Sequence, residues 1–149
     1  MAVKLIAVDG TDAHARQELV AFVHAHYQSE LPLEEGALAA GLLEFFWALD
    51  EEGKRVGCTA YTAKTRFLAE SVKTVVDPIF RGRQLGAAIS QAIEDEVRAR
   101  GFKKIMSTIL ITNLPMLFIK LKQGFIIEGI HMDHEKPGLH EYSLGKVLR

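Results

Sequence analysis

The chain has 149 residues, of which 48% are hydrophobic and 25% are charged, and its 18 Lys and Arg against 19 Asp and Glu leave a net charge of −1. This length fits one domain, residues 1–149, and the apolar fraction can fill a core, which excludes a disordered chain and a small disulfide scaffold. A chain so close to neutral has no overall field that would attract nucleic acid or an anionic membrane. The single Cys58 cannot form an internal disulfide and favours a reducing compartment, so we expect a cytoplasmic protein.

In chain order, the residues predict a strand over Val3–Val8, a helix that Thr11 or Asp12 caps, a short helix over Leu33–Gly41, and a hairpin of strands over Leu43–Leu49 and Arg55–Lys64. They then predict a strand over Phe67–Val76, an amphipathic helix from Leu85 to Arg100, a strand over Lys104–Ile111, a helix from Asn113 to Lys122, and strands over Phe125–Met132 and Leu139–Val147. This order predicts an α/β (α+β) sandwich with one mixed sheet. The nearly unbroken apolar run of Lys104–Ile111 predicts burial of that strand on both faces.

The segment between Val75 and Ala88 joins a strand to a helix through a basic loop that contains glycine. Unpaired backbone N–H groups and the positive end of the helix form an anion site at such a junction. Gly82 and Gly86 would let a ligand approach the backbone, and the neighbouring arginines carry charge suited to phosphate. The spacing is neither that of a P-loop nor that of a dinucleotide fingerprint. The alternative is a solvated basic turn.

Two motifs in the second half of the chain resemble those of the GNAT superfamily of N-acetyltransferases. Val76-Asp77-Pro78 followed by Arg81-Gly82-Arg83-Gln84-Leu85-Gly86-Ala87 resembles its acetyl-CoA signature, Gln/Arg-x-x-Gly-x-Gly/Ala, with Gln84 where the first glycine usually stands. The segment from Asn113 to Phe125 is similar to the family's Asn-x-x-Ala-x-x-Leu-Tyr-x-x-x-Gly-Phe. The resemblance covers about residues 56–148.

The resemblance implies a mixed, mostly antiparallel sheet flanked by helices and splayed between the fourth and fifth strands, Phe67–Val76 and Lys104–Ile111. Acetyl-CoA would lie in that opening as co-substrate, its pantetheine along the end of the fourth strand and its pyrophosphate on the loop amides. The cofactor-binding residues that the resemblance implies are Thr74, Val75, Val76, Arg81, Gly82, Arg83, Gln84, Leu85, Gly86, Ala87 and Asn113. For Asn113, a plain helix cap is the alternative.

Glu70 is the predicted general base. It lies eleven residues before Arg81, at the position that the resemblance gives to the glutamate base of histone-type members. A buried carboxylate in an apolar strand segment holds its proton more tightly than in water, which suits a base near neutrality. The alternative is an outward-facing surface residue. Other relatives place a glutamate five residues before the motif asparagine, where this chain has Thr108.

Lys120 occupies the position seven residues after the motif asparagine, where the family usually has a tyrosine as general acid. A lysine is a weak acid for this task unless burial lowers its pKa. The simpler interpretation places Lys120 on the solvated face of an amphipathic helix. Tyr61, Tyr142 or solvent could then protonate the leaving thiolate, although no spacing supports either tyrosine.

The predicted function is transfer of an acetyl group from acetyl-CoA to a primary amine by direct attack. The alternatives are a non-catalytic acyl-CoA-binding sensor and an interaction module on the same fold. A small molecule or a protein supplies the amine, no nucleic acid or membrane partner is expected, and a homodimer stays open. We expect no metal site, because His131 and His134 are three apart on a strand and turn and would point to opposite sides.

Overall fold

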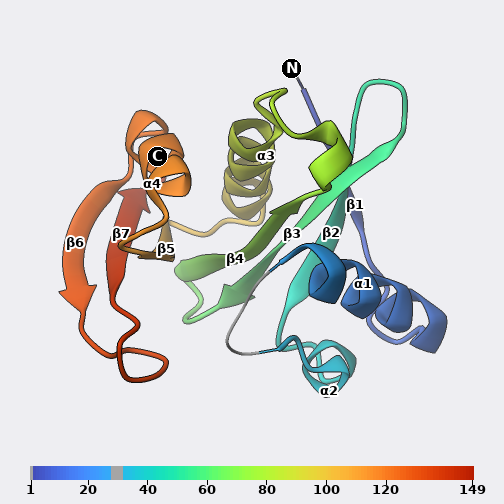
Figure 1. The fold of residues 1–149 in the computed structure, drawn as a ribbon, viewed down its shortest axis with the longest axis horizontal. Helices are drawn as coiled ribbons and strands as arrows, with labels where there is room; N and C mark the ends of the chain where they lie inside the picture. The colour runs from blue at the N-terminus through green and yellow to red at the C-terminus, as the bar shows by residue number, and fades with distance from the viewer. Residues whose placement is uncertain (1, 28–31) are drawn as a thin grey trace.

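Seven strands form one sheet, in the order β1-β2-β3-β4-β5-β7-β6, in a computed structural model that describes residues 2–27 and 32–149 (Figure 1). The strands are β1 (Lys4–Ala7), β2 (Glu44–Leu49), β3 (Arg55–Ala63), β4 (Leu68–Val76), β5 (Lys104–Leu110), β6 (Ile126–His131) and β7 (Glu141–Val147). Neighbouring strands run antiparallel except β4 and β5, which run parallel. The predicted fold class, a mixed and mostly antiparallel sheet, is confirmed.

Helices cover both faces of the sheet. They are α1 (Ala13–His26), α2 (Glu35–Ala39), α3 (Leu85–Ala99) and α4 (Leu114–Lys122), and a 3₁₀ turn, η1 (Pro78–Phe80), follows β4. The Asp12 side chain caps α1 by accepting from the amides of His14 and Ala15, as the sequence predicted for this position. One group of buried residues joins α1 and α2 to the sheet, and another joins α3 and α4 to the opposite face.

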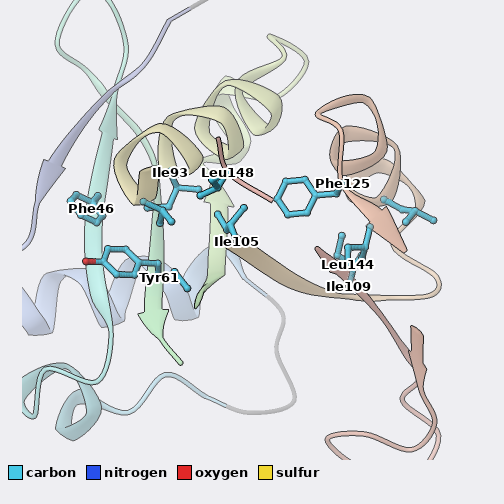
Figure 2. Packing of buried hydrophobic residues seen from close by; sticks show 11 residues of the cluster. Phe46, Tyr61, Ile93, Ile105, Ile109, Phe125, Leu144 and Leu148 are labelled. Atoms are coloured by element: carbon cyan, nitrogen blue, oxygen red, sulfur yellow. The ribbon is translucent and has the colours of Figure 1, made fainter. Parts of the chain in front are cut away.

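The larger core cluster lies between the sheet and α3 with α4. Figure 2 shows it as a row of side chains that runs from Phe46 and Tyr61 past Ile93 and Ile105 to Phe125. This row crosses from β2 and β3 to the last strands, so it holds the two ends of the sheet to one helical layer. Among the described residues, no helix has both the length and the apolarity needed to cross a membrane.

Strands β4 and β5 pair over a short length and then part. In the described structure their register joins Leu68 to Lys104, Ala69 to Ile105, and Glu70 to Met106, and it goes no further. Beyond this point β5, β7 and β6 turn away from β4 (Figure 1). The splayed fourth and fifth strands that the resemblance implied are therefore present.

Two irregularities accompany this parting. A register shift between Cys58 and Ala60 leaves an extra residue in β4, and Lys73 there takes a positive φ of 52°. Such a bulge bends its strand and raises its twist.

In β5, buried residues alternate with partly exposed ones, so the predicted burial of this strand on both faces is wrong. One face of β5 packs on the core, and residues of both faces, from Ser107 to Leu110, border the cavity described below.

Candidate active site

The parted strands open onto a cavity of about 840 Å³. Its walls come from β4 and β5, the end of α1, the start of α4 and the connection between β6 and β7. Four of the predicted site residues line it: Glu70, Thr74, Asn113 and Lys120. The volume is typical of small-molecule sites, and the lining contains several ionisable groups.

Glu70 and Lys120 reach this cavity from opposite faces of the sheet. Ala69 packs in the core cluster with α3 and α4, and the hydroxyl of Ser71 meets Lys120 from α4. Because side chains alternate along a strand, Glu70 between them points to the other face, which α1 and α2 cover. Val72, on the same face as Glu70, packs against the cluster of α1 and α2. The gap between β4 and β5 therefore has the acidic Glu70 on the face of α1 and α2 and the basic Lys120 on the face of α4.

Glu70 lies at the last paired position of the β4–β5 ladder. Its side chain is 12% exposed, and its Oε2 lies 2.8 Å from the Nζ of Lys64, which is itself half exposed. The alternative of an outward-facing surface residue does not hold, because β4 is a central strand and Glu70 lines the cavity. A carboxylate in this position can accept a proton from a group inside the cavity.

Lys120 is buried, so the expectation that it lies on a solvated helix face is wrong. Its side chain is among the largest fully buried ones, at 2% exposure. Its Nζ donates a long hydrogen bond of 3.4 Å to the Ser71 hydroxyl and lies 4.6 Å from the centre of the Phe125 ring. Burial lowers the pKa of Lys120 to about 8, and this lowering is opposed by Glu94 and assisted by Lys146.

The orientation of α4 explains this burial. Leu117 and Lys120 face inward, whereas Leu114, Phe118 and Leu121 are exposed. Hydrogen bonds of Gln123, just after the helix, fix its end: Gln123 donates to Glu94 at 2.6 Å and accepts from Ser90 at 2.6 Å. The i, i+3 spacing of Leu117 and Lys120 was the signal in the sequence that could have placed both on the inner face.

Glu94 is the centre of a buried ion-pair cluster beneath α4. It is fully buried, and its carboxylate contacts Arg98 at 2.8 Å and Lys146 at 2.7 Å. Burial alone would raise the pKa of Glu94, but the hydrogen bonds from Lys146, Gln123 and Arg98 outweigh it and hold this pKa below its ordinary value. Glu94 is thus committed to its own partners, and within the described residues Lys120 has no carboxylate at ion-pair distance.

The predicted phosphate loop contains a left-handed residue where the family motif has a glycine. Gln84, at the usual glycine position, takes a left-handed conformation with φ 58° and ψ 25°, at a cost of about 1 kcal/mol for a side chain. Gln84 is the N-cap of α3, and its side chain accepts no hydrogen bond from the first amides of this helix.

The loop residues lie outside the cavity lining. Arg81, Gly82, Arg83, Gln84 and Ala87 are exposed, Leu85 is buried in the core, and Gly86 approaches α4. A Cβ on Gly86 would lie 3.4 Å from the Cδ1 of Ile119. The side chain of Val75 is also buried, against the layer of α1 and α2. A ligand in the gap could therefore contact only the backbone of Val75 and of the adjoining Val76.

Asn113 is the N-cap of α4, since its side chain accepts from the amide of Met116 at 3.3 Å. The helix-cap interpretation is therefore confirmed, and Asn113 also lines the cavity. Thr74 lines it too, with its hydroxyl 2.9 Å from that of buried Thr59. Tyr61 and Tyr142, the other candidates for the acid, are not part of the lining.

The histidines are arranged differently from the prediction. The rings of His131 and His134 stack with centroids 4.4 Å apart, so the expectation that they point to opposite sides is wrong. The turn of residues 133–138 brings them together: the Asp133 amide donates to His140 Nδ1 at 3.0 Å. Within the described residues, no group of three metal-ligating side chains is found.

The sequence interpretation missed two residues at the outer end of the cavity, Tyr27 and Glu141. Tyr27 follows the last residue of α1, and Glu141 is the first residue of β7. Burial raises the pKa of Tyr27, and the carboxylates of Glu135 and Glu141 raise it further. No spacing in the sequence signalled this group, because its members come from three segments that only the fold brings together.

The comparisons with known proteins agree with this architecture. Solved structures of similar fold include the Sinorhizobium meliloti phosphinothricin acetyltransferase in complex with acetyl-CoA, at 21% identity and a TM-score of 0.73 over 99% of this chain and 89% of that one. The Salmonella typhimurium protein yncA, solved with acetyl-CoA, has 17% identity and a TM-score of 0.73 over 100% of this chain and 95% of that one. The Escherichia coli ribosomal-protein-S18-alanine N-acetyltransferase has 14% identity and a TM-score of 0.77 over 97% of this chain and 93% of that one.

At these identities the likeness establishes the fold alone. A search of curated proteins gives no significant match. The family comparison is direct evidence on the sequence itself: residues 12–125, more than half of the chain, match the acetyltransferase (GNAT) family. This range contains both motifs, the parted strands, and Glu70 and Lys120. The chain therefore belongs to the GNAT family of acetyltransferases.

Proposed function

We propose that this protein transfers an acetyl group from acetyl-CoA to a primary amine by direct attack, with Glu70 as general base and Lys120 as general acid. One observation carries this proposal: both side chains border the gap between β4 and β5, from opposite faces of the sheet. An acyl transfer to an amine needs a base on the side of the amine and an acid on the side of the leaving thiolate. The two faces supply these two functions separately.

The residues around the gap fit acetyl-CoA. In the described structure, β4 beyond Glu70 has no ladder partner in β5, so its backbone groups on that side are available to a pantetheine amide. The first amides of α3, with Arg81 and Arg83 beside them, suit a pyrophosphate. When bound, acetyl-CoA supplies the thioester whose carbonyl carbon the amine attacks.

Glu70 takes the proton that the acceptor must lose. A primary ammonium is not nucleophilic, so one proton passes from nitrogen to Glu70 before the N–C bond forms, and a second passes to solvent as the bond forms. The Glu70 carboxylate borders the cavity on the face of α1 and α2, where the open space admits an acceptor. The ammonium of Lys64 is the ion-pair partner of this carboxylate, at 2.8 Å.

Lys120 supplies the proton that the departing thiolate needs as the C–S bond breaks. Burial lowers the pKa of Lys120 to about 8, close to the value of about 8.5 for a free thiol. Proton transfer between two such groups is nearly balanced in energy, which favours general-acid catalysis. Lysine in place of the usual tyrosine is thus a competent acid in this environment.

Turnover is the test of the proposal. Release of CoA thiol would be followed with acetyl-CoA and a panel of amines, beside the shift in melting temperature that acetyl-CoA causes. Acetylated product with any amine supports the proposal. Stabilisation by acetyl-CoA without turnover on the panel would contradict it and indicate the non-catalytic acyl-CoA-binding sensor instead.

A further inference from the structure

Glu141 is a buried carboxylate that the catalytic proposal does not use. Its residue is 5% exposed, and it lines the cavity from the first position of β7. Within the described part of the chain, no hydrogen bond or ion pair involves its carboxylate. Among the described residues, the one side-chain polar atom that is both fully buried and without a partner is Arg98 Nε. The unpaired oxygens of Glu141 are therefore not fully buried, and they are accessible from the cavity that Glu141 lines.

The side chain of Glu141 lies on the same face of the sheet as that of Glu70. Leu144 belongs to the core cluster with α3 and α4, and Tyr142 packs against it, so Glu141 alternates to the opposite face. On β5, Ile105 and Ile109 belong to that same cluster. Leu110, the partner of Glu141, therefore points with Glu141 toward the layer of α1 and α2.

The neighbours of Glu141 add to its negative charge. Glu135, on the connection between β6 and β7, lies close enough to raise the pKa of Tyr27 together with Glu141. Lys73 also lines the cavity: its Nζ lies 5.0 Å from the centre of the Tyr27 ring, and it has a further partner of its own. An unpaired buried carboxylate costs stability, so a site that keeps one is built for a cation.

The register gives the offset of the two glutamates along the sheet, and the strand order gives their sideways separation: β4 and β7 flank β5 on opposite sides, so about 10 Å separates them across the strands. Glu70 pairs with Met106 and Glu141 with Leu110, four residues apart on β5. At about 3.3 Å per residue this is about 13 Å along the strand. Together the two components put the backbone positions about 16 Å apart, and two glutamate side chains that line the same cavity leave a span that a chain of several methylene groups can bridge.

We propose that Glu141 binds a second cationic group of the acceptor, so that the preferred substrate is an amine with another protonated nitrogen at its far end. This inference rests on the proposed acetyl transfer and names its substrate class. The reacting nitrogen lies at Glu70, and the distal ammonium replaces the missing partner of Glu141. The acceptor thereby removes the cost of the unpaired charge when it binds.

Binding to the complete protein with CoA present tests the proposal without relying on turnover. The probes are 1,8-diaminooctane and n-octylamine, which have the same carbon chain and differ in the second nitrogen. The variants are Glu141→Gln, which keeps shape and removes charge, and Glu128→Gln, which alters an exposed carboxylate outside the cavity. In wild type and Glu128→Gln, the diamine should bind about tenfold or more tightly than the monoamine; in Glu141→Gln this preference should disappear.

Steady-state kinetics supplies the second measurement. Glu141→Gln should raise KM for the diamine about tenfold or more, with kcat nearly unchanged and the monoamine unaffected. Equal diamine affinity in wild type and Glu141→Gln, or no preference for the diamine in wild type, would overturn the proposal. A fall in kcat with both amines would also overturn it, since Glu141 would then act on the reacting nitrogen. If no amine is acetylated, the acetyl-transfer proposal fails, while the binding preference still decides the role of Glu141.

Discussion

Glu70 and Lys120 line the same cavity from opposite faces of the sheet, Glu70 on the side of α1 and Lys120 on the side of α4, where β4 and β5 cease to pair. Each is committed to a different neighbour, Lys64 for Glu70 and Ser71 for Lys120. They form no ion pair with each other, which is what the proposed division into a base and an acid requires.

Replacing Glu70 by Gln should reduce kcat by about 10²–10⁴-fold, because the amide keeps the size of the side chain and removes the base. Affinity for acetyl-CoA should change little, since Glu70 lies on the face away from α4. Steady-state CoA release and an acetyl-CoA titration measure the two quantities. Lys64→Gln is the control, because it breaks the 2.8 Å ion pair and keeps the carboxylate. Unchanged activity of Glu70→Gln at pH 7 would remove Glu70 from the mechanism.

Replacing Lys120 by Met should reduce kcat by about 10–100-fold, toward the low end of general-acid effects because a thiolate leaves readily. In wild type, activity should fall above about pH 8, where Lys120 loses its proton, and this alkaline limb should be absent from the variant. Exposed Lys122→Met is the matched control on the same helix. Lys120→Tyr should restore activity to near that of wild type. A pH profile of Lys120→Met that parallels wild type would contradict the assignment.

The same residue predicts a pH dependence of stability. The pKa of Lys120 is about 8 in the folded protein and 10.5 as the ordinary value, so the unfolded chain binds the extra proton between these values. Stability of wild type should therefore rise with pH from about 8 to 10.5. Lys120→Met should be more stable than wild type at pH 7, by up to about 3 kcal/mol, and this advantage should shrink toward pH 10.5. Urea unfolding of both proteins at pH 7 and pH 10.5 measures this advantage. A stability difference between variant and wild type that is equal at the two pH values would contradict the prediction.

Gly86→Asp should sharply reduce the rise in melting temperature that acetyl-CoA causes, because it adds a negative charge beside the proposed pyrophosphate site. Gly86→Ala is the matched control: its Cβ would lie 3.4 Å from Ile119 Cδ1, which is ordinary contact distance, so the loop should keep its shape. Thermal shift of the three proteins with and without acetyl-CoA makes the comparison. If the aspartate variant responds like wild type, the pyrophosphate lies elsewhere.

Much of the fold could be predicted from the sequence because local patterns and tertiary packing agree. The strand of Phe67–Val76 and the helix starting at Leu85 were expected within a residue of their observed bounds. The helix expected over Leu33–Gly41 is shorter, Glu35–Ala39, and the left-handed Gly41 follows it. The loop motif also identified the family correctly, and Gln84 keeps the left-handed conformation that glycine would favour.

The environment of the site could not be predicted, because it depends on how elements are rotated against one another. The pattern of α4 indicated that apolar residues face inward, yet Phe118 is exposed and Lys120 is buried. The apolar run of β5 gave no sign of a cavity, since Ile109 and Leu110, which line it, look like core residues in sequence. Glu141 is part of the site only because β7 is inserted between β5 and β6.

The short β4–β5 ladder also makes the middle of the sheet its most weakly hydrogen-bonded junction. In the described structure three residue pairs, from Leu68–Lys104 to Glu70–Met106, join β1–β4 to β5–β7. Amides at this junction should exchange with deuterium through local opening well before those of the long β3–β4 and β5–β7 ladders do. A ligand that lies across the gap ties the two parts of the sheet together, so its binding should slow exchange on both sides of the junction. The proposed opening for substrate is thus also the place where the fewest hydrogen bonds hold the sheet together.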